Sequence, residues 1–166
     1  FLTNYFSEIG LTQVAGQPNG AGYALFALAC TSAAVCSIPF WLSIRTVFTK
    51  PTSVRYMGLV GTILGIVAAP FLSALSILAG DIFPYQHGLS TILFFLLYAS
   101  AIVLYSIAIL LNKQYYRNYS LAGFAVAAIC FVYIFFIGTA LMQKLAVYGL
   151  VLWSAFQGYA LLKIFH

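Results

Sequence analysis

Residues 56–80, YMGLVGTILGIVAAPFLSALSILAG, form an apolar stretch with no Asp, Glu, Lys, Arg or His. A helix rises about 1.5 Å per residue, so a stretch of this length exceeds the roughly 30 Å hydrocarbon core of a bilayer. Its apolar character is continuous instead of alternating, which is typical of a membrane helix and not of a barrel strand. The stretch therefore predicts a transmembrane helix.

Four further stretches without charged residues lie at about 20–44, 88–111, 119–142 and 145–162. The whole chain has 64% hydrophobic and 5% charged residues, with a mean hydropathy of +1.05. Such a composition leaves too few polar groups to cover the surface of a soluble domain. We therefore expect one all-α domain over residues 1–166, a polytopic transmembrane helix bundle with five spans and an outer segment at 1–19.

The charged residues predict the orientation. The net charge of +5 comes from seven Lys and Arg residues that are spread between apolar stretches, so no clustered face for nucleic acid is expected. If alternate connections lie on opposite sides of a membrane, six of the seven share one side: Arg45, Lys50, Arg55, Lys113, Arg117 and Lys163. Lys144, Glu8 and Asp81 lie on the other. By the positive-inside rule we expect a multi-pass protein of the cell membrane, with the C-terminus cytoplasmic and the N-terminal segment outside.

The first residues, FLTNYFSEIGLTQVAGQPNG, form neither a signal peptide nor an apolar stretch long enough to span a bilayer. Since the chain begins with Phe, we expect a further helix upstream that brings it to the outer face. The bundle would then have six spans with both termini in the cytoplasm.

Short motifs in the outer connections suggest a family. NYFSEIGLT at 4–12 and GQPNG at 16–20 lead into a helix, and a glycine-rich helix is followed by a proline and a histidine that opens the next one. The residues that carry this pattern are Ser7, Glu8, Gly10, Pro18, Asn19, Gly80, Phe83, Pro84 and His87. The chain resembles the uncharacterised six-helix membrane proteins of bacteria and archaea, a domain of unknown function distantly similar to the Frag/DRAM/Sfk type. The resemblance implies six helices and a prokaryotic cell membrane, and it brings no established chemistry.

The titratable groups gather in the outer connections. Glu8, Asp81 and His87 are three of the four Asp, Glu and His residues in the chain. Our first interpretation is an outer cap, in which Glu8 or Asp81 pairs with His87 and ties the N-terminal segment over the bundle. The alternatives are a weak, carboxylate-rich metal site and a hydrolytic Asp81–His87–Ser90 arrangement. The metal site would need three ligands of suitable type, and the hydrolytic site would need an oriented base and an oxyanion hole. We therefore expect no metal and no catalytic residue.

Small and polar residues within the spans suggest contacts between helices. Gly61, Gly65, Ala69 and Ser73 recur every four residues, which places a small-residue face on one helix for packing within the chain or in a dimer. Among the polar side chains are Tyr98, Tyr105 and Gln157. We expect them to bond between helices, with the lining of a lipid or quinone-like pocket as the alternative.

These features favour three functions in order. The absence of ionisable residues within the spans argues against an ion or proton carrier, and no cofactor motif is present. We expect first a non-catalytic structural or accessory subunit of a membrane assembly, second a protein that binds or handles lipid or another hydrophobic ligand, and third an outer-face metal-dependent or hydrolytic enzyme. The expected partners are membrane lipids, other membrane proteins or further copies of the chain.

Overall fold

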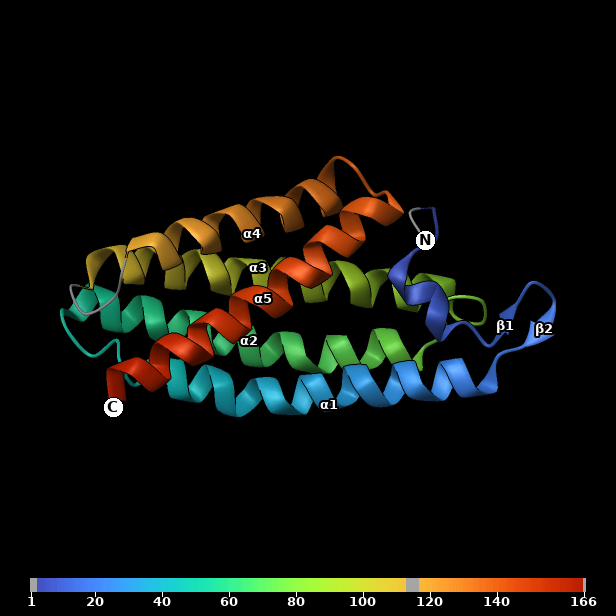
Figure 1. The fold of residues 1–166 in the computed structure, drawn as a ribbon, viewed down its shortest axis with the longest axis horizontal. Coiled ribbons are helices and arrows are strands. Elements are labelled where there is room, and N and C mark those ends of the chain that lie inside the picture. The colour runs from blue at the N-terminus through green and yellow to red at the C-terminus, as the bar shows by residue number, and fades with distance from the viewer. Residues whose placement is uncertain (1–2, 113–116, 166) are drawn as a thin grey trace.

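The computed structural model of the protein describes residues 3–112 and 117–165 and confirms the expected all-α helix bundle (Figure 1). Its five helices are α1 Gly20–Arg45, α2 Thr52–Ile77, α3 Pro84–Leu111, α4 Arg117–Phe135 and α5 Ala140–Phe165. All five are long and apolar enough to cross a membrane. The N-terminal segment consists of the 3-10 helix η1 Phe6–Gly10 and two short strands, β1 Gln13–Val14 and β2 Gln17–Pro18.

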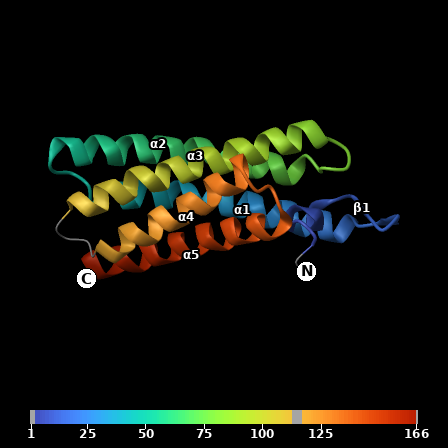
Figure 2. The same cartoon turned by 90° about the horizontal axis from the view of Figure 1, so that it is seen from above.

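Each helix packs chiefly on its neighbours in the sequence, and α3 lies at the centre of the array between α2 and α4 (Figures 1 and 2). Helix α5 crosses the bundle obliquely in front of α2 and α3 (Figure 1). It meets α1 through large rings, since the Trp153 ring lies 5.9 Å from the Trp41 ring and 6.1 Å from the Phe40 ring, measured between centroids. Toward the end that carries the N-terminal segment the two helices diverge.

The boundary between the last two helices differs from the spans expected at 119–142 and 145–162. Helix α4 ends at Phe135 and α5 begins at Ala140, so Lys144 lies one turn inside α5 and is buried instead of marking the connection. Thr139 caps the start of α5. Its hydroxyl accepts a hydrogen bond from the Met142 amide at 3.4 Å, and its carbonyl accepts one from the Gln143 amide at 3.0 Å. The connection itself, FIGT at 136–139, is apolar, and hydropathy therefore does not separate it from the helices.

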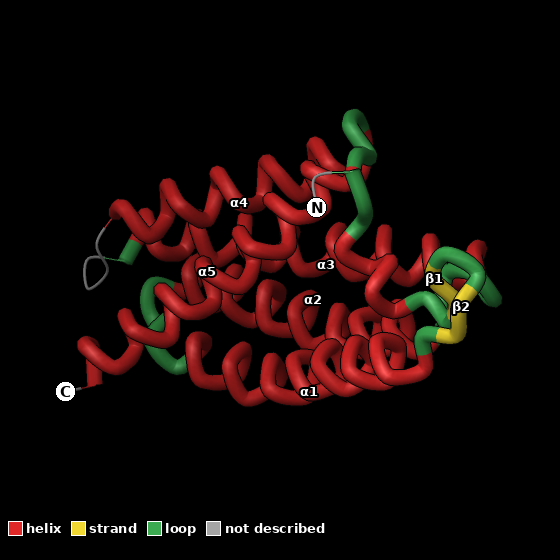
Figure 3. Tube along the Cα trace, turned by 45° about the vertical axis from the view of Figure 1, so that its right-hand side comes forward, coloured by secondary structure: helices red, strands yellow, loops and turns green. Residues whose placement is uncertain are grey.

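The N-terminal segment contains a small hairpin that the sequence analysis did not predict (Figure 3). Strands β1 and β2 are antiparallel, with Gln13 opposite Pro18 and Val14 opposite Gln17. The two residues between them, Ala15 and Gly16, have φ angles of 51° and 76°. Positive φ at both central positions gives the tight turn whose twist matches that of a hairpin.

The small-residue face of α2 receives aromatic rings from the same chain. A Cβ added at Gly61 would meet the Tyr105 ring at 2.9 Å, and one added at Gly65 would meet the Trp41 ring at 2.2 Å. Ala69 is buried, whereas Ser73 is partly exposed. Gly61 and Gly65 therefore serve packing against α3 and α1 within the chain.

Candidate functional site

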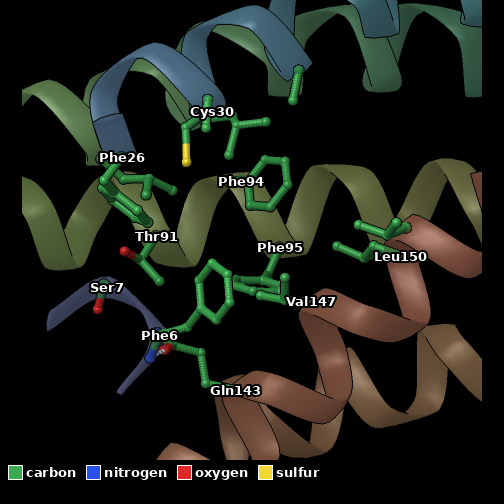
Figure 4. Close-up of a pocket in the computed structure, with 15 residues that line it drawn as sticks. Phe6, Ser7, Phe26, Cys30, Thr91, Phe94, Phe95, Gln143, Val147 and Leu150 are labelled. Atoms are coloured by element: carbon green, nitrogen blue, oxygen red, sulfur yellow. Dashed lines mark hydrogen bonds between the residues drawn. The ribbon is translucent and has the colours of Figure 1, made fainter. Parts of the chain in front are cut away.

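An apolar cavity of about 280 Å³ lies between α1 and α5, with α3 as its floor and η1 at the end nearest the hairpin (Figure 4). Figure 4 shows Phe26 and Cys30 on one wall, Val147 and Leu150 on the other, and Phe94 between them. The residues that line it are Phe6, Ser7, Phe26, Ala29, Cys30, Ala33, Leu72, Leu75, Thr91, Phe94, Phe95, Gln143, Val147, Leu150 and Val151. Ligand sites in proteins are typically apolar, with a few polar groups at defined places.

A second cavity of about 300 Å³ continues the first toward the middle of the bundle. The two share Ala33, Leu72, Phe94, Leu150 and Val151. The second adds Cys36, Ser37, Phe40, Tyr98 and Ser154. We call the two together the α1–α5 groove.

The α1–α5 groove follows from side-chain size and helix direction. Ala29, Ala33 and Ser37 recur every four residues on α1, so this wall has little bulk to fill the space that the oblique course of α5 leaves. Ala33 and Cys36 are exposed, and Val151 on the opposite rim is 61% exposed. The groove is therefore open sideways, on the surface that a membrane-spanning helix turns toward lipid.

Polar side chains along the groove are mostly bonded to the protein itself. Thr91 Oγ1 donates to the His87 carbonyl at 2.8 Å, and Ser37 Oγ donates to the Ala34 carbonyl at 2.7 Å. The Tyr98 hydroxyl bonds Ser154 Oγ at 2.9 Å, as expected for a contact between helices. The groove thus presents an apolar interior, with Ser7 as a hydroxyl at the end nearest the hairpin.

Helix η1 closes the α1–α5 groove at the end nearest the hairpin. The Phe6 ring lies 6.3 Å from the Phe26 ring of α1 and 6.1 Å from the Tyr148 ring of α5, measured between centroids. The Phe6 amide donates to Gln143 Oε1 at 2.7 Å, and the Tyr5 hydroxyl donates to the Gly138 carbonyl. Phe6 therefore bridges the two walls where they stand furthest apart. Neither Phe6 nor Gln143 was predicted from the sequence.

The outer carboxylates do not pair with His87 among the described residues, so that part of the outer-cap prediction is wrong. Asp81 Oδ2 accepts from the Thr12 hydroxyl at 2.6 Å, the Thr12 amide at 3.0 Å and the Gln13 amide at 3.1 Å. Glu8 instead accepts from Tyr5 and Asn4 within its own segment, at 2.9 and 2.7 Å. His87 Nδ1 bonds the Leu78 carbonyl at 3.0 Å. Backbone amides, the Thr12 hydroxyl and the Asn4 side-chain amide thus satisfy the carboxylates that were expected to meet the imidazole.

The hydrogen bonds of Asp81 and His87 also decide whether a metal site or a hydrolytic site can form there. The Thr12 hydroxyl, and after it the backbone amides of Thr12 and Gln13, lower the pKa of the Asp81 carboxyl, and loss of hydration acts against them. Within 3–112 and 117–165, no three His, Cys, Asp or Glu side chains lie close enough to hold a metal ion. Asp81 binds the β-hairpin and His87 binds a carbonyl, so the Asp81–His87–Ser90 arrangement does not assemble.

The other polar residues predicted within the spans have two kinds of surroundings. The Tyr105 hydroxyl bonds Thr62 Oγ1 at 2.6 Å and the Gly58 carbonyl at 3.1 Å, and so joins α3 to α2. Gln157 is fully buried, and neither its oxygen nor its nitrogen has a partner in the described part of the chain. The same holds for three other buried atoms: Trp41 Nε1, Trp153 Nε1 and Ser106 Oγ. Gln157 does not line the α1–α5 groove.

Comparisons with protein-family models, curated proteins and solved structures find no match to this chain. The resemblance to the uncharacterised six-helix family therefore remains a prediction.

Proposed function

We propose that this protein is a multi-pass protein of a prokaryotic cell membrane that holds a lipid acyl chain in the α1–α5 groove. The observation that carries the proposal is the groove itself, an apolar hollow that opens sideways toward the bilayer. The accessory-subunit role rests on composition alone, whereas the groove is a specific feature. For this reason we place ligand binding first.

The shape of the α1–α5 groove suits an extended chain. Its two cavities, of about 280 and 300 Å³, follow one another along α5 and share Phe94 and Leu150. Between Gln143 and Ser154 the α5 wall is about 17 Å long at 1.5 Å per residue, which suits part of an acyl chain lying along the helix.

The proposed orientation places the N-terminal segment outside and the C-terminus in the cytoplasm. Both acidic residues, Glu8 and Asp81, lie at the end that carries η1 and the hairpin, whereas Arg45 and Arg55 lie at the opposite end. Excess Lys and Arg in short connections mark the cytoplasmic side. The groove then opens in the outer half of the bilayer, so its ligand comes from the outer leaflet.

Photocrosslinking tests the proposal. The protein is reconstituted with phosphatidylcholine that carries a diazirine within one acyl chain, and the adducts are located by peptide mass spectrometry. We expect adducts on Cys30, Val147 and Leu150, because these residues line the groove. Ala33→Leu fills the space shared by both cavities and should lower these adducts severalfold.

Ala24→Leu is the matched control, since Ala24 is exposed on α1 and lies outside the groove. It should leave the adducts on the groove residues unchanged. Equal labelling of the exposed α1 residues Leu25 and Leu28 and of the groove residues would overturn the proposal. Equal effects of the two substitutions would do the same.

A further inference from the structure

Three cationic side chains surround a hollow at the end of the bundle opposite the hairpin. Arg45 ends α1, Lys50 lies in the connection, and Arg55 lies in the first turn of α2. All three line one cavity of about 490 Å³, together with Leu42, Thr46, Phe48 and Thr49. A neighbouring cavity shares Thr49, Lys50 and Arg55 and extends to Leu111 and Asn112. We call the two the basic hollow.

Neither acidic side chain of these 166 residues can neutralise the basic hollow. The two, Glu8 and Asp81, both lie at the other end of the bundle. The 26 residues of α2 alone separate the two ends by about 39 Å. Each carboxylate is also engaged there by hydrogen bonds. The positive charge of the basic hollow is therefore not balanced by a carboxylate side chain of these residues.

The start of α2 adds backbone donors to the basic hollow. The residue before the helix is Pro51, and no side chain caps the helix. The amide of Arg55 makes the first helical hydrogen bond, to the Pro51 carbonyl at 3.1 Å. The amides of Thr52 to Val54 precede that bond and have no acceptor within the helix. Free amides at the start of a helix attract anions, and the helix dipole adds to the attraction.

The connection that carries these charges is fixed to the bundle. Phe48 is almost fully buried, and its ring packs edge-on against that of Tyr105 at 5.4 Å between centroids. Gly58 allows this approach, because a Cβ there would meet the Phe48 side chain at 3.2 Å. Asn112 Nδ2 donates to the Val47 carbonyl at 3.3 Å. Lys50 and Arg55 therefore project from a backbone that these contacts fix in place.

We propose that the basic hollow binds a phosphate group at the inner membrane–water interface. The guanidinium groups of Arg45 and Arg55 and the ammonium of Lys50 suit the charge of a phosphate, and arginine can bond its oxygens in pairs. The hydroxyls of Thr49 and Thr52 lie among the lining residues as further donors. Basic pockets between helix ends on the cytoplasmic side bind lipid headgroups in this way. This site is separate from the α1–α5 groove.

Binding of phosphatidic acid to the full chain in a mild zwitterionic detergent tests the inference. Native mass spectrometry measures the bound fraction, with phosphatidylcholine as the comparison lipid. We expect phosphatidic acid to bind more tightly than phosphatidylcholine. The pair Lys50→Gln and Arg55→Gln should weaken it by about tenfold, equivalent to 1.4 kcal/mol.

The pair Arg117→Gln and Lys163→Gln is the matched control. It removes the same amount of charge at the same end of the bundle, outside the residues that line the basic hollow. It should change the affinity for phosphatidic acid much less. The thermal unfolding temperature without added lipid should be the same for both variant pairs. Equal temperatures would show that a folding defect does not cause the weaker binding of phosphatidic acid.

The outcomes distinguish the source of the phosphate. If millimolar inorganic phosphate displaces phosphatidic acid, a soluble phosphate can occupy the basic hollow; if it does not, the lipid is the ligand. Both results support the site. Equal binding of the two lipids, or equal losses in the two variant pairs, would overturn it. Ala33→Leu should leave this binding intact, so failure of the groove proposal can be recognised separately.

Discussion

Thr12 and Asp81, 69 positions apart in the sequence, are joined by two hydrogen bonds: the hydroxyl of Thr12 donates to Asp81 Oδ2 at 2.6 Å and its amide at 3.0 Å. The amide of Gln13 adds a third bond to the same oxygen. The connection between α2 and α3 thereby holds the hairpin that follows η1. A carboxylate, and not a histidine, is the anchor of the N-terminal segment.

The first prediction concerns this anchor. Asp81→Asn should loosen the hairpin, because a neutral amide accepts hydrogen bonds more weakly than a carboxylate. Limited proteolysis of the folded protein should then cut faster between residues 12 and 17, while the helical content stays unchanged. Glu8→Gln is the matched control, since the Glu8 carboxylate bonds only Tyr5 and Asn4 in the described part of the chain. Faster cutting in His87→Ala than in Asp81→Asn would contradict this account.

The second prediction is the pH dependence of the same contact. The hydrogen bonds from Thr12 and Gln13 lower the pKa of Asp81 in the folded protein. A lowered pKa means that the contact contributes fully above the ordinary aspartate pKa of about 3.9, and that this contribution is lost as the pH falls through the lower, folded value. Cleavage by an acid-active protease between residues 12 and 17 should therefore rise only below about pH 4. Asp81→Asn should remove this dependence, and a rise centred near pH 6.5, typical of histidine, would disprove the assignment.

The third prediction concerns the contact between Gly65 and Trp41. Gly65→Ala should lower the free energy of unfolding by about 1–3 kcal/mol, because the added methyl overlaps a buried ring that has no room to move. Thermal unfolding in detergent measures the loss. Gly158→Ala is the control, since a Cβ there meets nothing within 4 Å. If Gly65→Ala is as stable as Gly158→Ala, the packing of α1 on α2 differs from that described.

The fourth prediction is the orientation in the membrane. In a variant whose three native cysteines are replaced by alanine, a single cysteine is placed at Gln86, Gly138 or Thr49. A membrane-impermeant maleimide applied to whole cells should label Gln86→Cys and Gly138→Cys, which lie at the hairpin end, and spare Thr49→Cys at the other end. Labelling of Thr49→Cys alone would invert the proposed orientation.

The helices could be predicted from the sequence because each is a long apolar stretch between short polar connections. The apolar turn before Thr139 could not be seen, since hydropathy does not distinguish Phe136 and Ile137 from helical residues. The α1–α5 groove depends on the direction in which α5 crosses the bundle, which no single stretch encodes. A local sign of the groove in the sequence is the recurrence of Ala29, Ala33 and Ser37 every four residues along α1. The partner of His87 was mistaken because charge suggested a carboxylate, whereas a backbone carbonyl lies nearer.

The sequential packing of the helices has a consequence for the order in which the chain can fold. Each helix from α3 to α5 finds its main partner already synthesised, and α2 finds α1, so assembly can follow translation pair by pair. The N-terminal segment is the exception, because Tyr5 and Phe6 bond to Gly138 and Gln143, more than 130 positions later. Tyr5 and Phe6 are thus made before all five helices, yet they reach their places only after α5. Until α5 arrives, the hairpin end of the bundle has no closure.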